Sequence, residues 1–353
     1  MNKRDKKLVK VSFKKKIKYF FSEIKLFIIE EYKFLIACLL ILILFYCPVN
    51  YYIIIGGGIS DVGKRIEVDD EYSSEGSFNM SYVSQLVGTL GPYLLSYVIP
   101  TWDRESVDLY KYDVDEEVQD VELRSDLNLL SANSNAIYWA YTLANKECEI
   151  VKTNIYVLSV ISEFDSQFKV GDILLEIDNN KYNTLSEYQK YIQTLNAGDV
   201  IKVKVLRDNK EKTFDVELHK DGDRVVMGVY LQLINEYKTD PEVKFNFESD
   251  ESGPSAGLVT TLALYDKLTE GDLTNSLKIA GTGTLEADGT VGEIGGVKYK
   301  LLGAEAGDAD VFLVPSGTNY EECVKIKKEK KLKIKLIEVS TIEDAIEKLE
   351  SLK

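Results

Sequence analysis

Apolar side chains follow three successive patterns along the chain. Residues 34–55, FLIACLLILILFYCPVNYYIII, form 22 positions without a charge, and a helix of that length can cross ~30 Å of hydrocarbon. From residue 149 onward, apolar and polar positions alternate, which predicts strands. From residue 223 onward, strand-like and helix-like segments alternate, which predicts an α/β domain.

The uncharged segment has the flanks of a membrane anchor. Residues 1–33 contain ten Lys, one Arg and four acidic residues, a net charge of +7, and no charge follows between Lys33 and Asp61. Basic residues stay on the cytoplasmic side, and a tyrosine such as Tyr51 suits the opposite interface. We therefore expect a basic cytoplasmic tail at 1–33, a single-pass signal anchor at 34–55, and the remainder outside the cell membrane. The alternatives are a buried globular helix and a cleaved signal peptide, but the run is long and no A-x-A site follows it.

The overall charge and the cysteines exclude several classes of function. The chain carries −15, so the part after the basic tail carries −22, which argues against nucleic-acid binding. Two of the four cysteines lie in the apolar segment, and Cys148 and Cys323 are far apart. This spacing is neither a disulfide framework nor a metal site. We expect no metal and no cofactor.

Residues 58–64, GISDVGK, have the glycine and lysine spacing of a phosphate-binding loop. Arg65 stands where a Ser or Thr should hold Mg²⁺, and the segment follows the apolar run instead of a core strand. We therefore expect no nucleotide. The sequence assigns no function to residues 56–134. A helix is predicted for residues 126–147, which begins in this region and ends beyond it.

Residues 135–222 contain KVGDILLEIDNN and AGDVIKVKVLRD, with two strands around a turn at Asp208 and Asn209. This order of segments resembles a PDZ domain of the bacterial protease type. The resemblance implies that an extended peptide adds to a sheet edge. The family has a glycine-bearing loop before its binding strand, whereas the corresponding segment here, VKTNIYVLSV, has no glycine. A packing or spacer domain is the alternative.

Residues 223–353 alternate between predicted strands and helices, with a turn at Asp288 and Gly289 and a capping box formed by Ser340 and Glu343. The strands are VKFNF, LKIAGTGTLEADGTVGEIGG, DVFLVP and LKIKLIEVS, and the helices are AGLVTTLALYDKL, TNYEECVKIKKEK and TIEDAIEKLESLK.

Ser255, in ESGPSAG, is the candidate nucleophile. Small neighbours leave room for a substrate backbone, and the following helix would place free N–H groups near the serine. The alternative is an ordinary turn and N-cap. His219, the one histidine, ends a charged strand, and we expect it to be solvated instead of serving as the base.

A lysine can replace the histidine, because burial favours its neutral form. The segment GEIGGVKYKLLGAEAG offers two on one predicted helix, Lys298 and Lys300. Spacing alone does not choose between them.

Together, SGPSAG and GTGTLEADGTVGEIGGVKYK resemble the proteolytic domain of Lon proteases, and most closely a membrane-anchored bacterial branch that joins a PDZ domain to it without an ATPase. The order anchor, PDZ and Lon covers nearly the whole chain. The resemblance implies Ser255 as nucleophile, Lys300 as base and Thr282 as support for the lysine. The family often has Asp three residues before the serine, where this chain has Ser252.

The resemblance implies an α/β (α+β) Lon-type fold and a membrane-tethered, ATP-independent serine endopeptidase. Its partners would be protein or peptide substrates and the membrane, with a homo-oligomer as a further option. Two alternatives remain: a catalytically silent peptide-binding scaffold, and another Ser-Lys hydrolase such as a signal peptidase, whose active site normally lies near its anchor.

Overall fold

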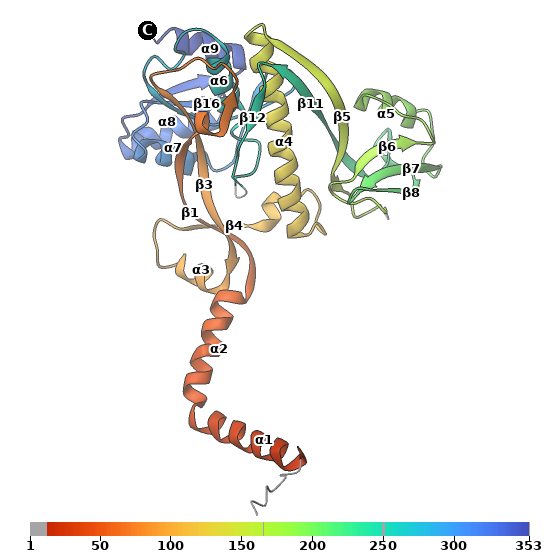
Figure 1. Cartoon of the computed structure of the whole chain (residues 1–353), viewed down its shortest axis with the longest axis vertical. Helices are drawn as coiled ribbons and strands as arrows, with labels where there is room; N and C mark the ends of the chain where they lie inside the picture. The colour runs from red at the N-terminus through yellow and green to blue at the C-terminus, as the bar shows by residue number, and fades with distance from the viewer. Residues whose placement is uncertain (1–12, 165, 249–250, 353) are drawn as a thin grey trace, which may run out of the picture. The chain divides into compact units, whose positions relative to one another are not determined.

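In a computed structural model of the chain, residues 13–164, 166–248 and 251–352 are described (Figure 1). The first part of the predicted basic tail, residues 1–12, lies outside these ranges. The chain divides into two compact units. The smaller holds residues 1–53 and 86–105, and the larger holds residues 54–85 and 106–353.

The smaller unit is mainly helical. Its helices are α1 (Phe13–Glu30), α2 (Tyr32–Tyr46) and α3 (Leu90–Leu95), and it contains most of the short strand β4 (Asp103–Ser106). The strands β1 (Pro48–Asp61) and β3 (Ser77–Thr89) each begin or end in it.

The single helix predicted for residues 34–55 is wrong. Helix α2 ends at Tyr46, and the chain continues as β1 from Pro48. Proline cannot continue a helix because it lacks an N–H and its ring clashes with the preceding turn, and the β-branched and tyrosine side chains that follow favour a strand. Within the ranges that the structure describes, no helix combines the length and the apolar character that a membrane crossing requires.

The larger unit contains a mainly parallel sheet in which strands follow the order β17, β16, β13, β3 and β1. Strand β13 (Lys278–Gly281) pairs in parallel with β16 (Val311–Pro315) on one side and with β3 on the other. The last strand, β17 (Lys335–Val339), pairs in parallel with β16. Residues 56–134, to which the sequence assigned no function, thus supply a strand beside β13.

Helices cover both faces of this sheet. Val311 and Leu313 of β16 pack in one apolar cluster, whereas Phe312 and Val314 pack in another, because successive strand residues point to opposite faces. The first cluster includes residues of α6 (Gly257–Leu268) and α9 (Ile342–Glu350), and the second includes residues of α7 (Val297–Ala306) and α8 (Thr318–Lys330). The result is a three-layer α/β/α arrangement, as predicted for an α/β domain (Figure 1).

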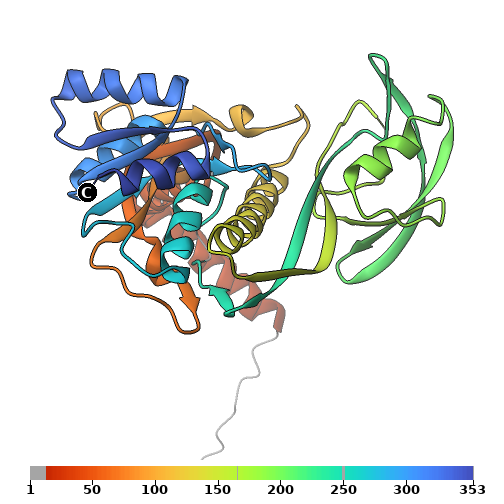
Figure 2. The same cartoon turned by 90° about the horizontal axis from the view of Figure 1, so that it is seen from above.

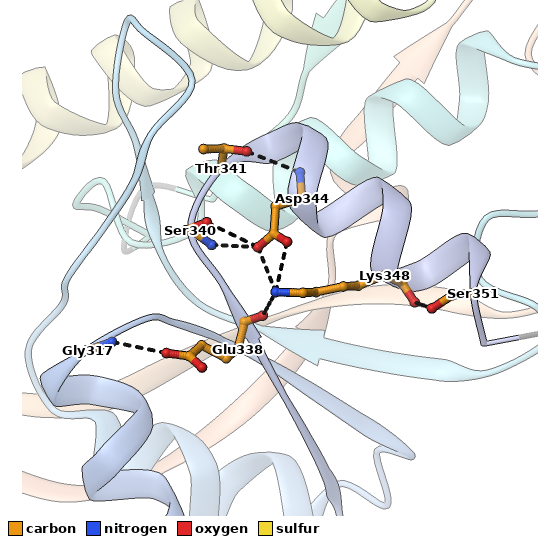
Figure 3. A network of polar contacts seen from close by, with 7 residues as sticks. All are labelled: Gly317, Glu338, Ser340, Thr341, Asp344, Lys348 and Ser351. Atoms are coloured by element: carbon orange, nitrogen blue, oxygen red, sulfur yellow. Dashed lines mark hydrogen bonds and ion pairs between the residues drawn. The ribbon is translucent and has the colours of Figure 1, made fainter.

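Most elements predicted for residues 223–353 are confirmed, but the capping box is wrong by one residue. Thr341 is the N-cap of α9, and its Oγ1 accepts a hydrogen bond of 3.1 Å from the Asp344 N–H. The Asp344 carboxylate in turn accepts from the Ser340 N–H at 2.9 Å and contacts Lys348 (Figure 3). Ser340 cannot cap the helix because its carbonyl still accepts from Val291 N at the end of β17.

The second sheet of the larger unit has the order β11, β5, β6, β7 and β8. A separate apolar cluster, from Ile155 to Met227, packs against it with α5. Asp208 and Asn209 join β7 to β8 with positive φ, so the predicted turn is confirmed. The elements are β5 (Glu147–Val160), β6 (Ile173–Ile177), α5 (Leu185–Ile192), β7 (Val200–Arg207), β8 (Lys210–Glu217) and β11 (Val229–Asp240).

The edge strand beside α5 is β11, not β5. The segment VKTNIYVLSV lies in β5, which pairs with β11 on one side and β6 on the other, so it cannot accept an added peptide strand along its length. Strand β11 is the last strand of the sheet and contacts α5. Gly228, with a φ of +75°, precedes it. The absence of glycine before β5 is therefore no argument about peptide capture.

Strands β5 and β11 form a long antiparallel ribbon, from the pair Glu147 and Asp240 to the pair Val160 and Val229. The two strands run side by side in both views (Figures 1 and 2). Strand β11 therefore completes the sheet that contains β5, although it follows the predicted domain boundary at residue 222.

Helix α4 (Val118–Leu143) begins earlier than the helix predicted for residues 126–147, and the expected boundary at 134/135 falls inside it. Its Ala140 packs in the apolar cluster of the first sheet. Its Ser134 Oγ donates a hydrogen bond of 3.0 Å to the Asn235 carbonyl of β11. One helix therefore contacts both sheets of the larger unit.

Candidate active site

Ser255 lies in the turn immediately before α6 and is half-buried. Ala256 is the N-cap of the 12-residue helix α6. The expectation of free N–H groups at its start is wrong for the first two, because Gly257 N–H donates to the Pro254 carbonyl at 3.1 Å and Leu258 N–H donates to the Gly283 carbonyl at 3.2 Å. Gly253 has a φ of +87°, a conformation that side chains rarely allow, and its N–H donates to the Ser125 carbonyl of α4 at 3.1 Å. Gly253 therefore produces a sharp turn just before Ser255.

The carbonyl oxygen of Ser255 is fixed by the loop that follows β13. It accepts a hydrogen bond of 2.9 Å from the Gly283 N–H and one of 3.1 Å from the Thr282 hydroxyl. Gly281 allows this close approach, because a Cβ there would lie 2.8 Å from a methyl group of Val259 in α6. The segment GTGT is therefore held against the turn that precedes α6.

Lys300 extends from α7 into the interior and is only 5% exposed. Its Nζ donates a hydrogen bond of 3.2 Å to Thr282 Oγ1. Burial lowers the pKa of Lys300 to about 7, because the apolar surroundings disfavour the ammonium form. The helix begins after Gly296, which has a φ of +68° and turns the chain into α7.

Lys298, on the same helix, lies in different surroundings. It is half-buried, and its Nζ lies 4.9 Å from the ring centroid of Tyr299. The structure thus separates the two lysines that spacing alone could not: Lys300 contacts Thr282, which in turn contacts Ser255. Their catalytic roles stay predictions.

The two other sequence features examined for chemistry take no part in this arrangement. His219 in β9 (His219–Asp221) is half-buried and stacks on Phe164, with ring centroids 4.3 Å apart, so it is only partly exposed to solvent. Residues 58–64 run from the end of β1 into a 3-10 helix (Val62–Arg65), and Lys64 pairs with Asp61 at 3.3 Å.

Sequence reasoning missed the side chains that hold the segment before Ser255. Arg65 Nη2 lies 2.7 Å from Glu248 Oε1 and 3.0 Å from Glu251 Oε1, and the Arg65 carbonyl accepts from the Asn246 N–H at 2.7 Å. Ser125 Oγ donates to Ser252 Oγ at 3.3 Å. No local motif marks Arg65, because 186 residues separate it from Glu251.

Comparisons with known proteins agree with this architecture. Residues 111–218 match the PDZ domain family, and residues 249–351 match the Lon protease (S16) C-terminal proteolytic domain. A Lon protease of Desulfatibacillum aliphaticivorans is 32% identical over 141 residues, which cover 37% of this chain and 17% of that protein. A Lon protease of Campylobacter jejuni is 27% identical over 198 residues, which cover 48% of this chain and 24% of that protein.

The matched segments thus span about a fifth of the length of these curated Lon proteases. The crystal structure of the PDZ domain of an SdrC-like protein from Listeria monocytogenes is 24% identical and covers 24% of this chain and 92% of that one, with a TM-score of 0.23. The family matches carry the assignment: this chain contains a PDZ domain followed by the C-terminal proteolytic domain of a Lon-type serine peptidase.

Proposed function

We propose that the chain is a membrane-tethered serine endopeptidase that cleaves extended or unfolded extracytoplasmic proteins without ATP. Ser255 is the nucleophile, Lys300 the base, and Thr282 the residue that orients the lysine. The observation that carries this proposal is the buried Lys300 amine with a pKa lowered to about 7, hydrogen-bonded to the hydroxyl that also contacts Ser255.

The lowered pKa makes the lysine a competent base. An ordinary lysine, with a pKa of ~10.4, is almost wholly charged at neutral pH, whereas a group with a pKa of about 7 is neutral in roughly half of the molecules. Because the Thr282 proton is directed to the Ser255 carbonyl, its hydroxyl accepts from the Lys300 N–H. The nitrogen lone pair is then left for the Ser255 hydroxyl.

The reaction is acyl transfer. Lys300 removes the Ser255 Oγ proton while Oγ attacks the peptide carbonyl, and the positive end of the α6 dipole stabilises the oxyanion. As the tetrahedral intermediate collapses, the C–N bond breaks and the Lys300 ammonium protonates the leaving amine. Water then attacks the acyl-enzyme, Lys300 takes its proton, and the released Ser255 oxygen takes that proton back.

The PDZ domain supplies or selects substrate segments in this proposal. Strand β11 is the edge strand beside α5, and an extended peptide can add its backbone hydrogen bonds to such an edge. Ser131 and Ser134 of α4 form hydrogen bonds with Gln232 and Asn235 of β11. The residues of β11 before position 232 are therefore the part that would accept a peptide.

Membrane tethering is supported by the N-terminal residues. Residues 1–33 carry a net charge of +7, which favours the cytoplasmic side for them. Helix α2 has no charged residue after Lys33, and none of its residues is buried within the chain. A helix this apolar and this exposed needs an apolar environment. The PDZ and proteolytic domains would then lie outside the cell.

The test is hydrolysis of a reduced, unfolded test protein by the detergent-solubilised full-length chain, with and without ATP. The proposal expects equal rates in both conditions and no cleavage by Ser255→Ala. A strict ATP requirement would overturn nucleotide independence. Unchanged cleavage by Ser255→Ala would overturn the nucleophile. A wild-type chain that neither cleaves nor reacts with a fluorophosphonate probe would instead be the catalytically silent scaffold.

A further inference from the structure

A second uncharged stretch lies in the smaller unit. No Asp, Glu, Lys or Arg occurs between Glu75 and Asp103, a composition as unusual in this acidic chain as that of residues 34–60. The smaller unit contains residues 34–53 of the first stretch and residues 86–102 of the second. Two uncharged segments that are distant in sequence therefore belong to one compact unit.

Helix α3 joins these two segments. A Cβ at Gly91 would lie 3.0 Å from the Leu44 carbonyl oxygen, so the glycine lets α3 approach the last turns of α2 closely. The Leu90 N–H donates to the Cys47 carbonyl at 3.0 Å. Helix α3 thus packs at the C-terminal end of α2.

The outer side of this region is apolar and exposed. Leu94 and Leu95 are each 49% exposed and Val98 is 76% exposed. Leu86 and Val87 are also exposed. Large exposed apolar side chains close together in the chain mark a contact with an apolar partner, because water opposes their exposure.

A polar and aromatic rim adjoins the apolar side chains. The Tyr93 and Tyr97 hydroxyls lie 3.0 Å apart, and the Arg104 guanidinium lies 3.8 Å from the Tyr97 ring centroid. Arg104 Nη1 also donates to Ser96 Oγ at 3.0 Å. Tyrosine and arginine side chains bury an apolar body and keep a polar end in water, which suits the headgroup level of a bilayer.

The short length of α2 favours lipid as the partner of these exposed apolar side chains. Its 15 residues correspond to ~22 Å of helix, short of the ~30 Å of a hydrocarbon core. We propose that residues 86–98, built around α3, insert into the bilayer leaflet at the C-terminal end of α2 and extend the apolar surface that α2 provides. This inference rests on the proposed membrane tethering.

The experiment uses the full-length chain in vesicles of phosphatidylcholine and phosphatidylglycerol. Cys38, Cys47 and Cys148 are replaced by Ala, the buried Cys323 is retained, and an environment-sensitive fluorophore is attached at Val98→Cys. The matched control is Val114→Cys, at a position 86% exposed in the larger unit. We expect blue-shifted emission and at least threefold quenching by brominated lipid at position 98, and neither effect at position 114.

The outcomes separate the inference from the function on which it rests. If the chain does not float with vesicles, membrane tethering and this inference are both overturned. If it floats but position 98 behaves like position 114, only the insertion of residues 86–98 is overturned. Blue-shifted emission that brominated lipid does not quench would instead show a contact between two copies of the chain and would also overturn the inference.

A second variant tests the surface without a label. Leu94→Ser, Leu95→Ser and Val98→Ser together change only exposed side chains. We expect this triple variant to be extracted from the vesicles by alkaline carbonate at least threefold more readily than the wild type, with unchanged hydrolysis of a soluble peptide. Equal extraction would contradict the inference.

Discussion

Lys300 Nζ lies 3.2 Å from Thr282 Oγ1, at the end of a side chain that is almost completely buried. Because burial holds the lysine pKa at about 7, the fraction of neutral base rises with pH through that value. We expect kcat/KM for a quenched peptide to climb about tenfold per pH unit below pH 6 and to level off above pH 8. A profile that rises only near pH 10 would show that the active base is a solvated lysine.

The two lysines of α7 should differ sharply in mutants. Ser255→Ala and Lys300→Ala should each lower kcat by several orders of magnitude, and the double mutant should be little worse, because the pair acts as a unit. Lys298→Ala should cost ~tenfold or less, equivalent to ~1.4 kcal/mol of barrier. Steady-state hydrolysis of a quenched peptide checks this prediction. An inactive Lys298→Ala beside an active Lys300→Ala would reverse the assignment.

Thr282→Val should give an intermediate activity. Valine keeps the shape of threonine but removes the hydroxyl that contacts both Lys300 and the Ser255 carbonyl. We expect kcat between those of Lys298→Ala and Lys300→Ala, with a small change in KM, since the lysine remains but is no longer oriented. Activity equal to the wild type would exclude an orienting role.

The buried lysine should destabilise the folded chain at neutral pH. Its pKa is about 7 when folded and ~10.4 when unfolded, so the unfolded state binds more protons between these values. The free energy of unfolding therefore rises with pH across that window. The destabilisation caused by burying Lys300 reaches its full value below pH 7. At pH 7, Lys300→Met should unfold at a higher temperature than the wild type. Its free energy of unfolding should exceed that of the wild type by at most ~4 kcal/mol. The difference in stability between Lys300→Met and the wild type should disappear near pH 11. A difference that stays constant with pH would contradict the lowered pKa.

Arg65 should matter for catalysis although it lies far from the family motifs. Arg65→Ala removes both carboxylate contacts that hold the segment before Ser255, so we expect kcat to fall about tenfold, with the pH midpoint unchanged because Lys300 is not contacted. Arg65→Lys should recover part of the loss. The control is Arg224→Ala, which breaks only the exposed pair with Asp221. Equal effects of Arg65→Ala and Arg224→Ala would contradict positioning.

The PDZ domain can be removed at the Val160 and Val229 end of the ribbon that β5 and β11 form. Val160 and Val229 face each other in the β5 and β11 register, so an Asn-Gly turn can replace residues 161–228. Cleavage of an unfolded protein should fall several-fold more than hydrolysis of a short peptide. Equal losses of both activities would favour a spacer role.

Local patterns predicted the site better than the surrounding fold. SGPSAG and GGVKYK each determine a turn followed by a helix, so the positions of Ser255 and of the two lysines of α7 could be predicted from nearby residues, whereas only the family resemblance favoured Lys300 over Lys298. Helix α8 has the bounds of the predicted segment TNYEECVKIKKEK, because its glycine start and its lysine-rich end are local signals.

Long-range relationships could not be predicted in this way. An apolar run has no period that distinguishes a buried strand from a helix, so the change from α2 to β1 at Pro48 escaped the analysis. The edge position of β11 depends on a partner about 80 residues away in sequence. Arg65 reaches Glu251 across 186 residues, and no pattern in either segment indicates the other.

The pairing of β3 with β13 limits how the proteolytic domain can be isolated. Ser77 to Met80 pair with Lys278 to Gly281. Residues 77–80 lie well before the part of the chain that matches the Lon family, which begins at residue 249. A fragment that begins after the PDZ domain would leave one side of β13 with unpaired N–H and C=O groups. Such an exposed strand pairs readily with other molecules and promotes aggregation. Soluble expression of the catalytic core therefore requires residues 54–85 together with residues 241–353.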